Sequence, residues 1–331
     1  MPDLSLSLAV SRNQMTEPIL AGLVRPQGVD WHVSALHPSE MFWRQLRYRE
    51  FDISEMSLSS LTIAASQGRF DWKAIPVFTT RKFFHTQVLI NDSAGIRKPA
   101  DLAGRRVGVP EYQQTAAVWA RGALEHEFGV RPQDMRWFME RPPQRSHGGP
   151  AFRPPPGVRL SYIAPDTNIG DMLTGGELDA ALVYIADRNL VDRSRAAVAA
   201  MPAVRPLFDD PVAEGVRYYE KTGILPMNHV VVLRAELVER YPWLALNVYS
   251  AFLEAKRLAT EPLRQLLDPW VQLGLVPGKA LGPLGDTDPL PYGLAGQLTV
   301  VEELGKYLAE QGLISAPVRM ADLFTGNSAQ L

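Results

Sequence analysis

The chain has 331 residues, enough for two lobes, and its 46% hydrophobic and 21% charged residues are typical of a globular protein. A net charge of −2 gives no electrostatic reason to expect nucleic acid or an anionic membrane as a partner. The chain contains no cysteine, which excludes disulfides, thiolate metal sites and a cysteine nucleophile. Its first ten residues alternate like a strand, without the features of a signal peptide, and no stretch is long enough to span a bilayer. We therefore expect a cytoplasmic protein.

Strand and helix patterns alternate through the first hundred residues. In chain order we predict a strand at 4–10, a helix at 16–23, a strand at 29–36, a helix at 40–48, a strand at 51–56, a helix at 57–67, and strands at 74–78 and 87–91. This alternation is typical of βαβ units and of a largely parallel sheet.

A turn at 98–104, with Pro99 near its start and Gly104 at its end, marks the predicted passage to a second lobe. Beyond it we predict strands at 105–109 and 135–139, helices from 116 and at 169–174, a buried strand within 175–184, and a helix at 211–222. Residues 141–158 are rich in Pro, Gly and Arg, and we interpret them as a long inserted loop.

A strand at 224–233 is predicted to return to the first lobe, and helices at 235–240, 243–260 and 298–311 follow it. The chain would then cross between the lobes near 79–91 and again near 223–233. The predicted lobes are residues 1–98 together with 225–331, and residues 99–224.

Two stretches, 51–60 and 108–117, have the pattern of a strand, a turn and a helix start. A helix N-terminus leaves backbone N–H groups unpaired and carries partial positive charge, which suits a carboxylate or phosphate. An ordinary strand-to-helix turn has the same pattern, so each stretch alone is weak evidence. One such stretch in each half of the chain predicts a ligand cleft between the lobes.

Several motifs together resemble the 4,5-dihydroxyphthalate decarboxylase family. They are Arg81 with Phe83 and His85, residues 101–113, residues 176–180, Tyr218-Tyr219 with the Thr222-Gly223-Ile224 that follows, Asn228-His229, residues 237–244 and residues 291–293. The resemblance covers nearly the whole chain. It implies a two-lobed α/β fold of the periplasmic-binding-protein-like type II class, with a ligand cleft between the lobes, used as a cytoplasmic enzyme. Phe84 departs from the family pattern, which has a second arginine there, and loss of that cation would change substrate preference.

The implied activity is decarboxylation of a hydroxylated aromatic acid, with a small aromatic carboxylate as the binding partner. A phenol para to the departing carboxylate supplies the electrons, so no organic cofactor is obligatory, and the protein supplies orientation and a proton. No histidine or carboxylate spacing favours a metal site. A solute-binding protein for a small carboxylate is the alternative, because it would need the same two lobes. Homo-oligomerisation is left open by the sequence.

His85 and His229 are the candidate proton donors, because histidine titrates near neutral pH. We favour His85, since it lies in a segment that connects strands beside Arg81, whereas His229 lies in an apolar strand typical of a buried structural histidine. Arg81 could bind a carboxylate with two parallel hydrogen bonds, although a solvated surface position is the commoner fate of an arginine.

The remaining candidates are predicted to bind substrate at the strand ends and helix starts. They are Arg12, Ser57, Ser59, Ser60, Glu111, Tyr112, Thr115 and Tyr184. Ser57 could equally be a plain helix cap, and Glu55 could be a ligand-facing carboxylate or an edge residue. We expect the ligand to lie between residues 57–60 and 112–115, in contact with Arg81 and His85.

Overall fold

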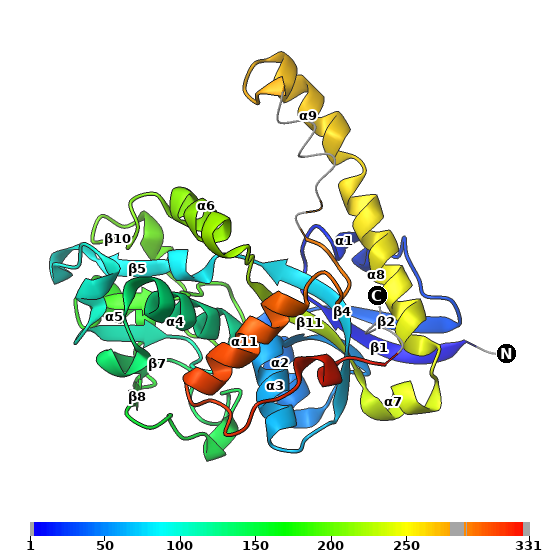
Figure 1. The fold of residues 1–331 in the computed structure, drawn as a ribbon, viewed down its shortest axis with the longest axis horizontal. Helices are drawn as coiled ribbons and strands as arrows, with labels where there is room; N and C mark the ends of the chain where they lie inside the picture. Colours follow the sequence, from blue (N-terminus) through cyan, green and yellow to red (C-terminus); the bar gives the residue numbers. More distant parts are fainter. Residues whose placement is uncertain (1–2, 279–287, 289, 327–331) are drawn as a thin grey trace.

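Two β-sheets, each covered by helices, form two lobes side by side (Figure 1). The computed structural model describes residues 3–278, 288 and 290–326. The helices are α1 (Glu17–Leu20), α2 (Pro38–Tyr48), α3 (Leu58–Ser66), α4 (Thr115–Phe128), α5 (Ile169–Thr174), α6 (Pro211–Thr222), α7 (Ala235–Arg240), α8 (Leu244–Thr260), α9 (Leu263–Gln272) and α11 (Leu298–Glu310).

The sheet of the first lobe has the strand order β2-β1-β3-β11-β4. Its strands are β1 (Leu4–Val10), β2 (Val29–Ala35), β3 (Ile53–Ser57), β4 (Trp72–Arg81) and β11 (Met227–Arg234). The predicted parallel βαβ units are present, because β1 pairs in parallel with both β2 and β3. β11 is antiparallel to β3 and β4, so this late strand lies between two early ones.

The sheet of the second lobe has the order β10-β5-β9-β6-β7-β8. Its strands are β5 (Val88–Asn91), β6 (Arg106–Val109), β7 (Arg136–Met139), β8 (Arg159–Tyr162), β9 (Ala180–Leu182) and β10 (Val204–Pro206). β8 and β10 were not predicted. They are short, and β8 is a largely exposed edge strand, so neither carries a clear apolar alternation.

The chain passes from the first sheet to the second between β4 and β5, through a 3₁₀ turn at Phe84–Thr86, and returns between α6 and β11. We expected the first lobe to extend to residue 98. β5 instead pairs with β9 and β10, so the chain changes sheets before residue 88. The turn at 98–104 lies within the second lobe, because pairing with distant strands, not the local turn, decides where β5 belongs.

The C-terminal helix α11 spans the seam between the lobes, where it contacts both α3 and α4 (Figure 1). Gly122 of α4 allows this close approach, since a Cβ there would lie 2.1 Å from the ring of Tyr307 on α11. Arg121 Nε also donates to the side-chain oxygen of Gln311 at 2.9 Å. These contacts fix the start of α4, which borders the site described below.

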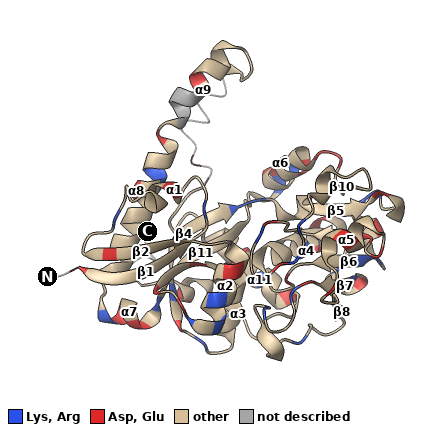
Figure 2. Ribbon diagram, turned by 180° about the vertical axis from the view of Figure 1, so that it is seen from behind, with Lys and Arg blue, Asp and Glu red and all other residues tan. Residues whose placement is uncertain are grey.

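α8 and α9 form an arm that projects from the first lobe (Figure 1). Among the described residues, no helix is long and apolar enough to cross a membrane. Acidic and basic residues are interspersed over both lobes (Figure 2), as expected for a net charge of −2.

Candidate active site

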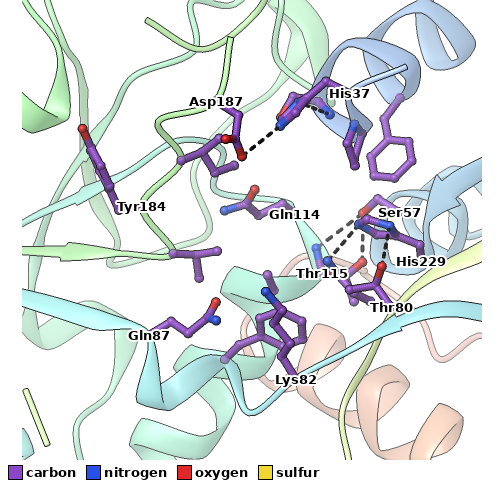
Figure 3. A pocket seen from close by; sticks show the side chains of 18 of the residues that line it. His37, Ser57, Thr80, Lys82, Gln87, Gln114, Thr115, Tyr184, Asp187 and His229 are labelled. Atoms are coloured by element: carbon purple, nitrogen blue, oxygen red, sulfur yellow. Dashed lines mark hydrogen bonds and ion pairs between the residues drawn. The ribbon is translucent and has the colours of Figure 1, made fainter. Parts of the chain in front are cut away.

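A cavity of about 240 Å³ lies at the seam between the lobes (Figure 3). Its polar lining comes from both lobes and includes His37, Ser57, Thr80, Lys82, Gln87, Gln114, Thr115, Tyr184, Asp187, Asn228 and His229. Because a cavity of roughly 150 Å³ can hold a benzene ring, this one has room for a single substituted ring.

His229 lies on β11 between Ser57 of β3 and Thr80 of β4, its direct neighbours across the sheet. The pairing of β11 with β4 shifts register on both sides of His229. Such irregularities are common next to active sites, where they redirect a side chain. At this irregularity the His229 imidazole lines the cavity, although His229 itself is buried in the sheet.

Glu55 lies beneath His229 in the first sheet and fixes its orientation. Glu55 Oε2 is 3.0 Å from His229 Nδ1, and Asn228 Nδ2 is 2.8 Å from His229 Nε2. The Glu55 carboxylate is fully buried and also accepts hydrogen bonds from Ser11 and Thr79. Burial pushes the pKa of Glu55 up, but the hydrogen bonds, led by that from His229, outweigh it and hold the pKa below its usual value.

An imidazole paired with a buried carboxylate is an arrangement suited to acid–base chemistry. A carboxylate that accepts the Nδ1 proton fixes the tautomer and the orientation of the ring. The edge of the His229 ring also meets Phe42, with the ring centroids 4.8 Å apart. His229 is therefore held by Glu55 at Nδ1, by the Asn228 amide, which donates to Nε2, and by Phe42.

Gln114 presents unused hydrogen-bonding groups to the cavity (Figure 3). It is the N-cap residue of α4 and only 8% exposed, yet its Nε2 has no partner among the described residues. Leaving a buried donor unpaired costs roughly 1–3 kcal/mol. A ligand oxygen in the cavity would remove that penalty, so this amide points to bound ligand.

Lys82 supplies positive charge to the same cavity. Its ammonium group makes no ion pair or hydrogen bond with the part of the chain that the structure describes. An unpaired cation beside the unpaired Gln114 amide favours a ligand with carboxylate groups.

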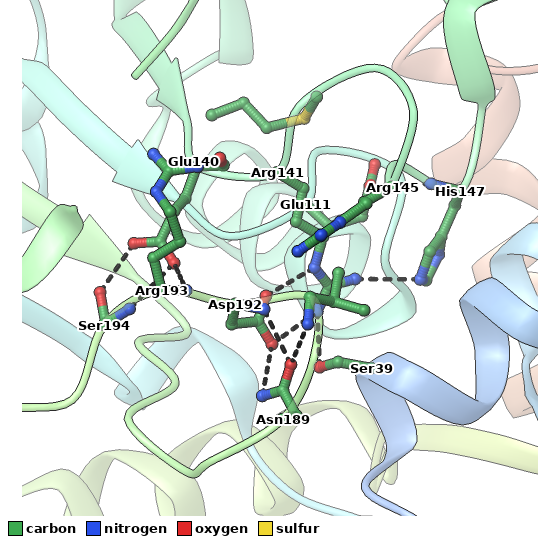
Figure 4. Close-up of polar contacts among 12 residues, drawn as sticks. Ser39, Glu111, Glu140, Arg141, Arg145, His147, Asn189, Asp192, Arg193 and Ser194 are labelled. Atoms are coloured by element: carbon green, nitrogen blue, oxygen red, sulfur yellow. Dashed lines mark hydrogen bonds and ion pairs between the residues drawn. The ribbon is translucent and has the colours of Figure 1, made fainter. Parts of the chain in front are cut away.

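Arg141 and His147 form one buried wall of the cavity (Figure 4). Arg141 Nε donates to Asp192 at 2.6 Å, Nη2 to Ser39 Oγ at 2.6 Å, and Nη1 to His147 Nε2 at 3.1 Å. A guanidinium has no acceptor, so His147 Nε2 must be unprotonated and Nδ1 donates to Ser60 Oγ, 2.8 Å away. Burial, with help from Arg141, holds the pKa of His147 well below its usual value.

We expect acid to destabilise the protein partly through His147. Its pKa is about 6.5 in the unfolded chain and lower in the folded protein. Between those values the unfolded state binds more protons, so the free energy of unfolding falls by about 1.4 kcal/mol per unit of acidification. Thermal melting of wild type and His147→Gln at about pH 7 and about pH 5.5 checks this. The variant should lose less Tm on acidification, and an equal loss in both proteins would contradict the assignment.

Four of the residues predicted from the sequence line the cavity: Ser57, Thr115, Tyr184 and His229. The two predicted helix starts meet directly, because Ser57 Oγ lies 2.9 Å from Thr115 Oγ1 and Ser59 Oγ donates to the Gln113 carbonyl at 2.6 Å. The ligand therefore cannot lie between residues 57–60 and 112–115 as we expected. The cavity lies beside this junction.

Arg81 and His85 do not line the cavity, contrary to expectation. His85 is 1% exposed, and its Nε2 is 3.0 Å from Glu214 Oε1 on α6. Arg81 donates to Gln297 Oε1 at 2.7 Å and to the Pro291 carbonyl at 2.8 Å, and burial lowers its pKa to about 10. Through these hydrogen bonds, both side chains stabilise the segments that connect the lobes.

The other predicted binding residues also have structural partners. Arg12 forms an ion pair with Glu17 on the surface. Glu111 is buried and accepts from the backbone N–H groups of Gln113 and His147, while burial raises its pKa. Tyr112 is buried under Arg121, whose guanidinium carbon is 3.9 Å from the centre of the ring. Ser59 donates its backbone N–H to Thr115 Oγ1 where the two helix starts meet, and Ser60 Oγ hydrogen-bonds to His147 Nδ1.

Sequence reasoning missed several residues that line the cavity, including His37, Lys82, Gln87, Gln114, Arg141, His147, Asp187 and Asn228. Three of them are close to residues that we had singled out from the sequence. Lys82 follows Arg81, Gln114 lies in the stretch 108–117, and Asn228 precedes His229. Arg141 and His147 lie in the segment that we interpreted as an inserted loop. The sequence of that segment has no periodicity that would indicate where its side chains point. Phe84, the departure from the family pattern, forms an apolar part of the wall.

The fold defines the class of protein. The chain is similar to the alkanesulfonate-binding protein SsuA from Xanthomonas axonopodis pv. citri (TM-score 0.61, 13% identity, 98% of this chain and 99% of that one). It is also similar to the desulfurization enzyme DSZB (TM-score 0.51, 15% identity, 98% and 97%). The predicted two-lobed, periplasmic-binding-protein-like fold is thus confirmed. This fold serves a binding protein and an enzyme alike, so it does not decide function.

Sequence comparison identifies the family, although no family model matches the chain. The chain is 33% identical over 328 residues to a 4,5-dihydroxyphthalate decarboxylase of Comamonas testosteroni, covering 98% of this chain and 97% of the relative. A 4,5-dihydroxyphthalate decarboxylase of Pseudomonas putida is 37% identical over 183 residues, which cover 55% of this chain and 71% of the relative. The chain belongs to the 4,5-dihydroxyphthalate decarboxylase family, a family of carboxy-lyases.

Proposed function

We propose that the protein decarboxylates a hydroxylated aromatic acid in the cytoplasm without an organic cofactor, and that 4,5-dihydroxyphthalate is its first candidate substrate. The products would be 3,4-dihydroxybenzoate and CO₂. Family membership supports the reaction class. The observation that carries the proposal is the Glu55–His229 pair at the wall of a cavity sized for one ring.

The proposed step exchanges a carboxylate for a proton at one ring carbon. Each carboxylate of 4,5-dihydroxyphthalate has a hydroxyl para to it, and this hydroxyl donates electron density to the carbon that bears the carboxylate. In this structure Nε2 accepts from the Asn228 amide, so the step requires that amide to turn away and His229 to be protonated on both nitrogens. The Nε2 proton then passes to that carbon, the bond to the carboxylate breaks, and CO₂ leaves. The electron pair of the broken bond returns to the ring and restores aromaticity, and Glu55 orients His229 for the transfer.

The rest of the cavity would hold the dianionic substrate. The Gln114 amide can donate to one carboxylate, together with whichever hydroxyl of the Ser57–Thr115 pair does not donate to the other. Lys82 can neutralise the other, and Phe84 offers an apolar surface to the ring. These contacts would restrict how the ring lies against His229 Nε2, which is the positioning the reaction requires.

A solute-binding role is the competing proposal. The similarity to SsuA supports it, but at 13% identity that similarity shows the fold alone. A binding protein has no need for an imidazole oriented by a buried carboxylate, which a proton transfer uses.

Turnover of defined aromatic acids separates the two proposals. Purified protein is incubated with 4,5-dihydroxyphthalate, with 4-hydroxyphthalate and with phthalate, while CO₂ and the aromatic product are measured. Decarboxylation of the hydroxylated acids, with phthalate unreacted, is expected because phthalate lacks the para hydroxyl. Tight binding of all three without CO₂ release would favour the solute-binding role.

Replacing Gln114 with leucine is expected to weaken substrate binding. A hydrogen bond to a charged group contributes about 1.5–3 kcal/mol, so KM should rise roughly 10- to 150-fold. Steady-state kinetics of Gln114→Leu and of the neighbouring control Gln113→Leu measure the effect, since Gln113 does not line this cavity. A similar KM in both variants would remove Gln114 from the binding site.

A further inference from the structure

A second cavity of about 180 Å³ lies on the other side of the wall formed by His147 and Ser60. His147 lines both cavities, whereas Arg69, Gln113 and Arg153 line only the second. The second lining includes both arginines but no Asp or Glu side chain. The proposed reaction uses none of these three residues, so this cavity needs an explanation of its own.

Gln113 is the most informative residue of the second cavity. It is 7% exposed, and its side-chain amide makes no hydrogen bond with any residue that the structure describes. Gly148 makes room for this amide, since a Cβ there would lie 2.6 Å from Gln113 Oε1. Gln113 is thus a largely buried residue whose amide has no partner in the described part of the chain, and a ligand in the second cavity would supply one.

The two glutamines serve opposite sides of one wall. They directly precede α4: Gln113 lies in a turn that starts at Glu111, and Gln114 is the extended N-cap residue. Gln114 faces the first cavity and Gln113 the second. The wall between the cavities is itself hydrogen-bonded, through His147 Nδ1 to Ser60 Oγ at 2.8 Å and Ser60 Oγ to Ser57 Oγ at 3.2 Å.

We propose that the second cavity is a separate binding site for a small carboxylate-type anion. Arg69 and Arg153 provide two positive charges, and each guanidinium retains N–H groups beyond those that bond to Gln67, Pro150 and Phe152. Gln113 adds a buried amide, and Phe152 and Leu313 add apolar surface. A planar aromatic monocarboxylate matches this combination, and bicarbonate shares its anionic group.

Isothermal titration calorimetry with benzoate tests the proposal without any need for turnover, because benzoate has no hydroxyl to support decarboxylation. Wild type should bind benzoate at two sites, one in each cavity. Arg69→Gln/Arg153→Gln should weaken one of them roughly tenfold or more and leave the other unchanged. Arg97→Gln/Arg159→Gln removes two exposed arginines that line neither cavity, and should keep both sites.

Gln113→Leu keeps both arginines and provides a second, independent variant. It should weaken the same site, whereas Gln114→Leu should weaken the other one. A bicarbonate titration identifies which anion the site takes. Binding heat with bicarbonate that is present in wild type and absent in Arg69→Gln/Arg153→Gln would identify the inorganic ion as the ligand. Binding heat with benzoate but not with bicarbonate would identify an aromatic carboxylate. The proposal would be overturned by a single benzoate site in wild type with no bicarbonate heat that depends on Arg69 and Arg153. Two benzoate sites unchanged in both Arg69→Gln/Arg153→Gln and Gln113→Leu would also overturn it, whatever the enzyme's substrate.

Discussion

Replacing His229 with asparagine is expected to lower kcat by roughly 10²- to 10⁴-fold, the usual contribution of a general acid. Asparagine can still place an amide near Glu55, but it has no group that can give a proton at the position of Nε2. Steady-state measurement of CO₂ release from 4,5-dihydroxyphthalate gives kcat, and circular dichroism shows whether the variant keeps its fold.

The chain offers a matched control for this experiment. His85 also lies 3.0 Å from a glutamate, Glu214, and is also buried, but it does not line the cavity. His85→Asn should lower the melting temperature and leave kcat close to that of wild type. The reverse pattern, with normal turnover in His229→Asn and a large loss in His85→Asn, would transfer the role of acid to His85, as the sequence alone had suggested.

Replacing Glu55 with glutamine is the second change with a large expected effect. The neutral amide cannot stabilise the imidazolium form of His229 and can present an N–H group to its Nδ1, which would favour the wrong tautomer. In a comparable carboxylate–histidine pair this substitution lowers kcat by about 10⁴-fold, so we expect a loss of roughly 10²- to 10⁴-fold here.

Stability has to be measured alongside this loss, because Glu55 also accepts hydrogen bonds from Ser11 and Thr79. Weakening such bonds costs roughly 1–3 kcal/mol. Glu214→Gln changes the partner of His85 in the same way and should affect melting but not kcat. Retention of more than about a tenth of wild-type kcat in Glu55→Gln would show that His229 does not depend on this carboxylate.

The fold was largely predictable because its strongest signals are local. Strand and helix periodicity located β1, β3, α3, β6 and α4 close to their observed bounds. The placement of β5 was not predictable, since it depends on pairing with β9 and β10, more than eighty residues further along the chain. Edge strand β8, with little apolar patterning, was missed for a related reason.

At the site, the sequence located the right segments but not the direction of their side chains. Lys82 and Phe84 line the cavity, whereas Arg81 and His85 do not. Arg81 ends β4, whereas Phe84 and His85 lie in the 3₁₀ turn that follows, so no simple alternation in the sequence gives the directions of these side chains. The register of β4 against β11 fixes the direction of Arg81, and that register depends on contacts over about 150 residues.

Glu55 shows a second limit. The sequence left it as either a ligand-facing carboxylate or an edge residue. Its actual role, as the partner of His229, follows from the antiparallel pairing of β3 with β11, which places Ser57 opposite His229 and Glu55 diagonal to it on the same face. No local pattern carries that information.

A crystal structure of the protein with phthalate bound would test the central claim most directly. Phthalate has both carboxylates but no hydroxyl to drive decarboxylation, so it should bind without reacting. We predict that a ring carbon bearing a carboxylate lies within about 3.5 Å of His229 Nε2, the separation expected of groups placed to react, with the Gln114 amide bonded to a carboxylate. Phthalate bound away from His229, or with both of its carboxylate-bearing carbons remote from Nε2, would contradict the assignment of the Glu55–His229 pair as the proton source.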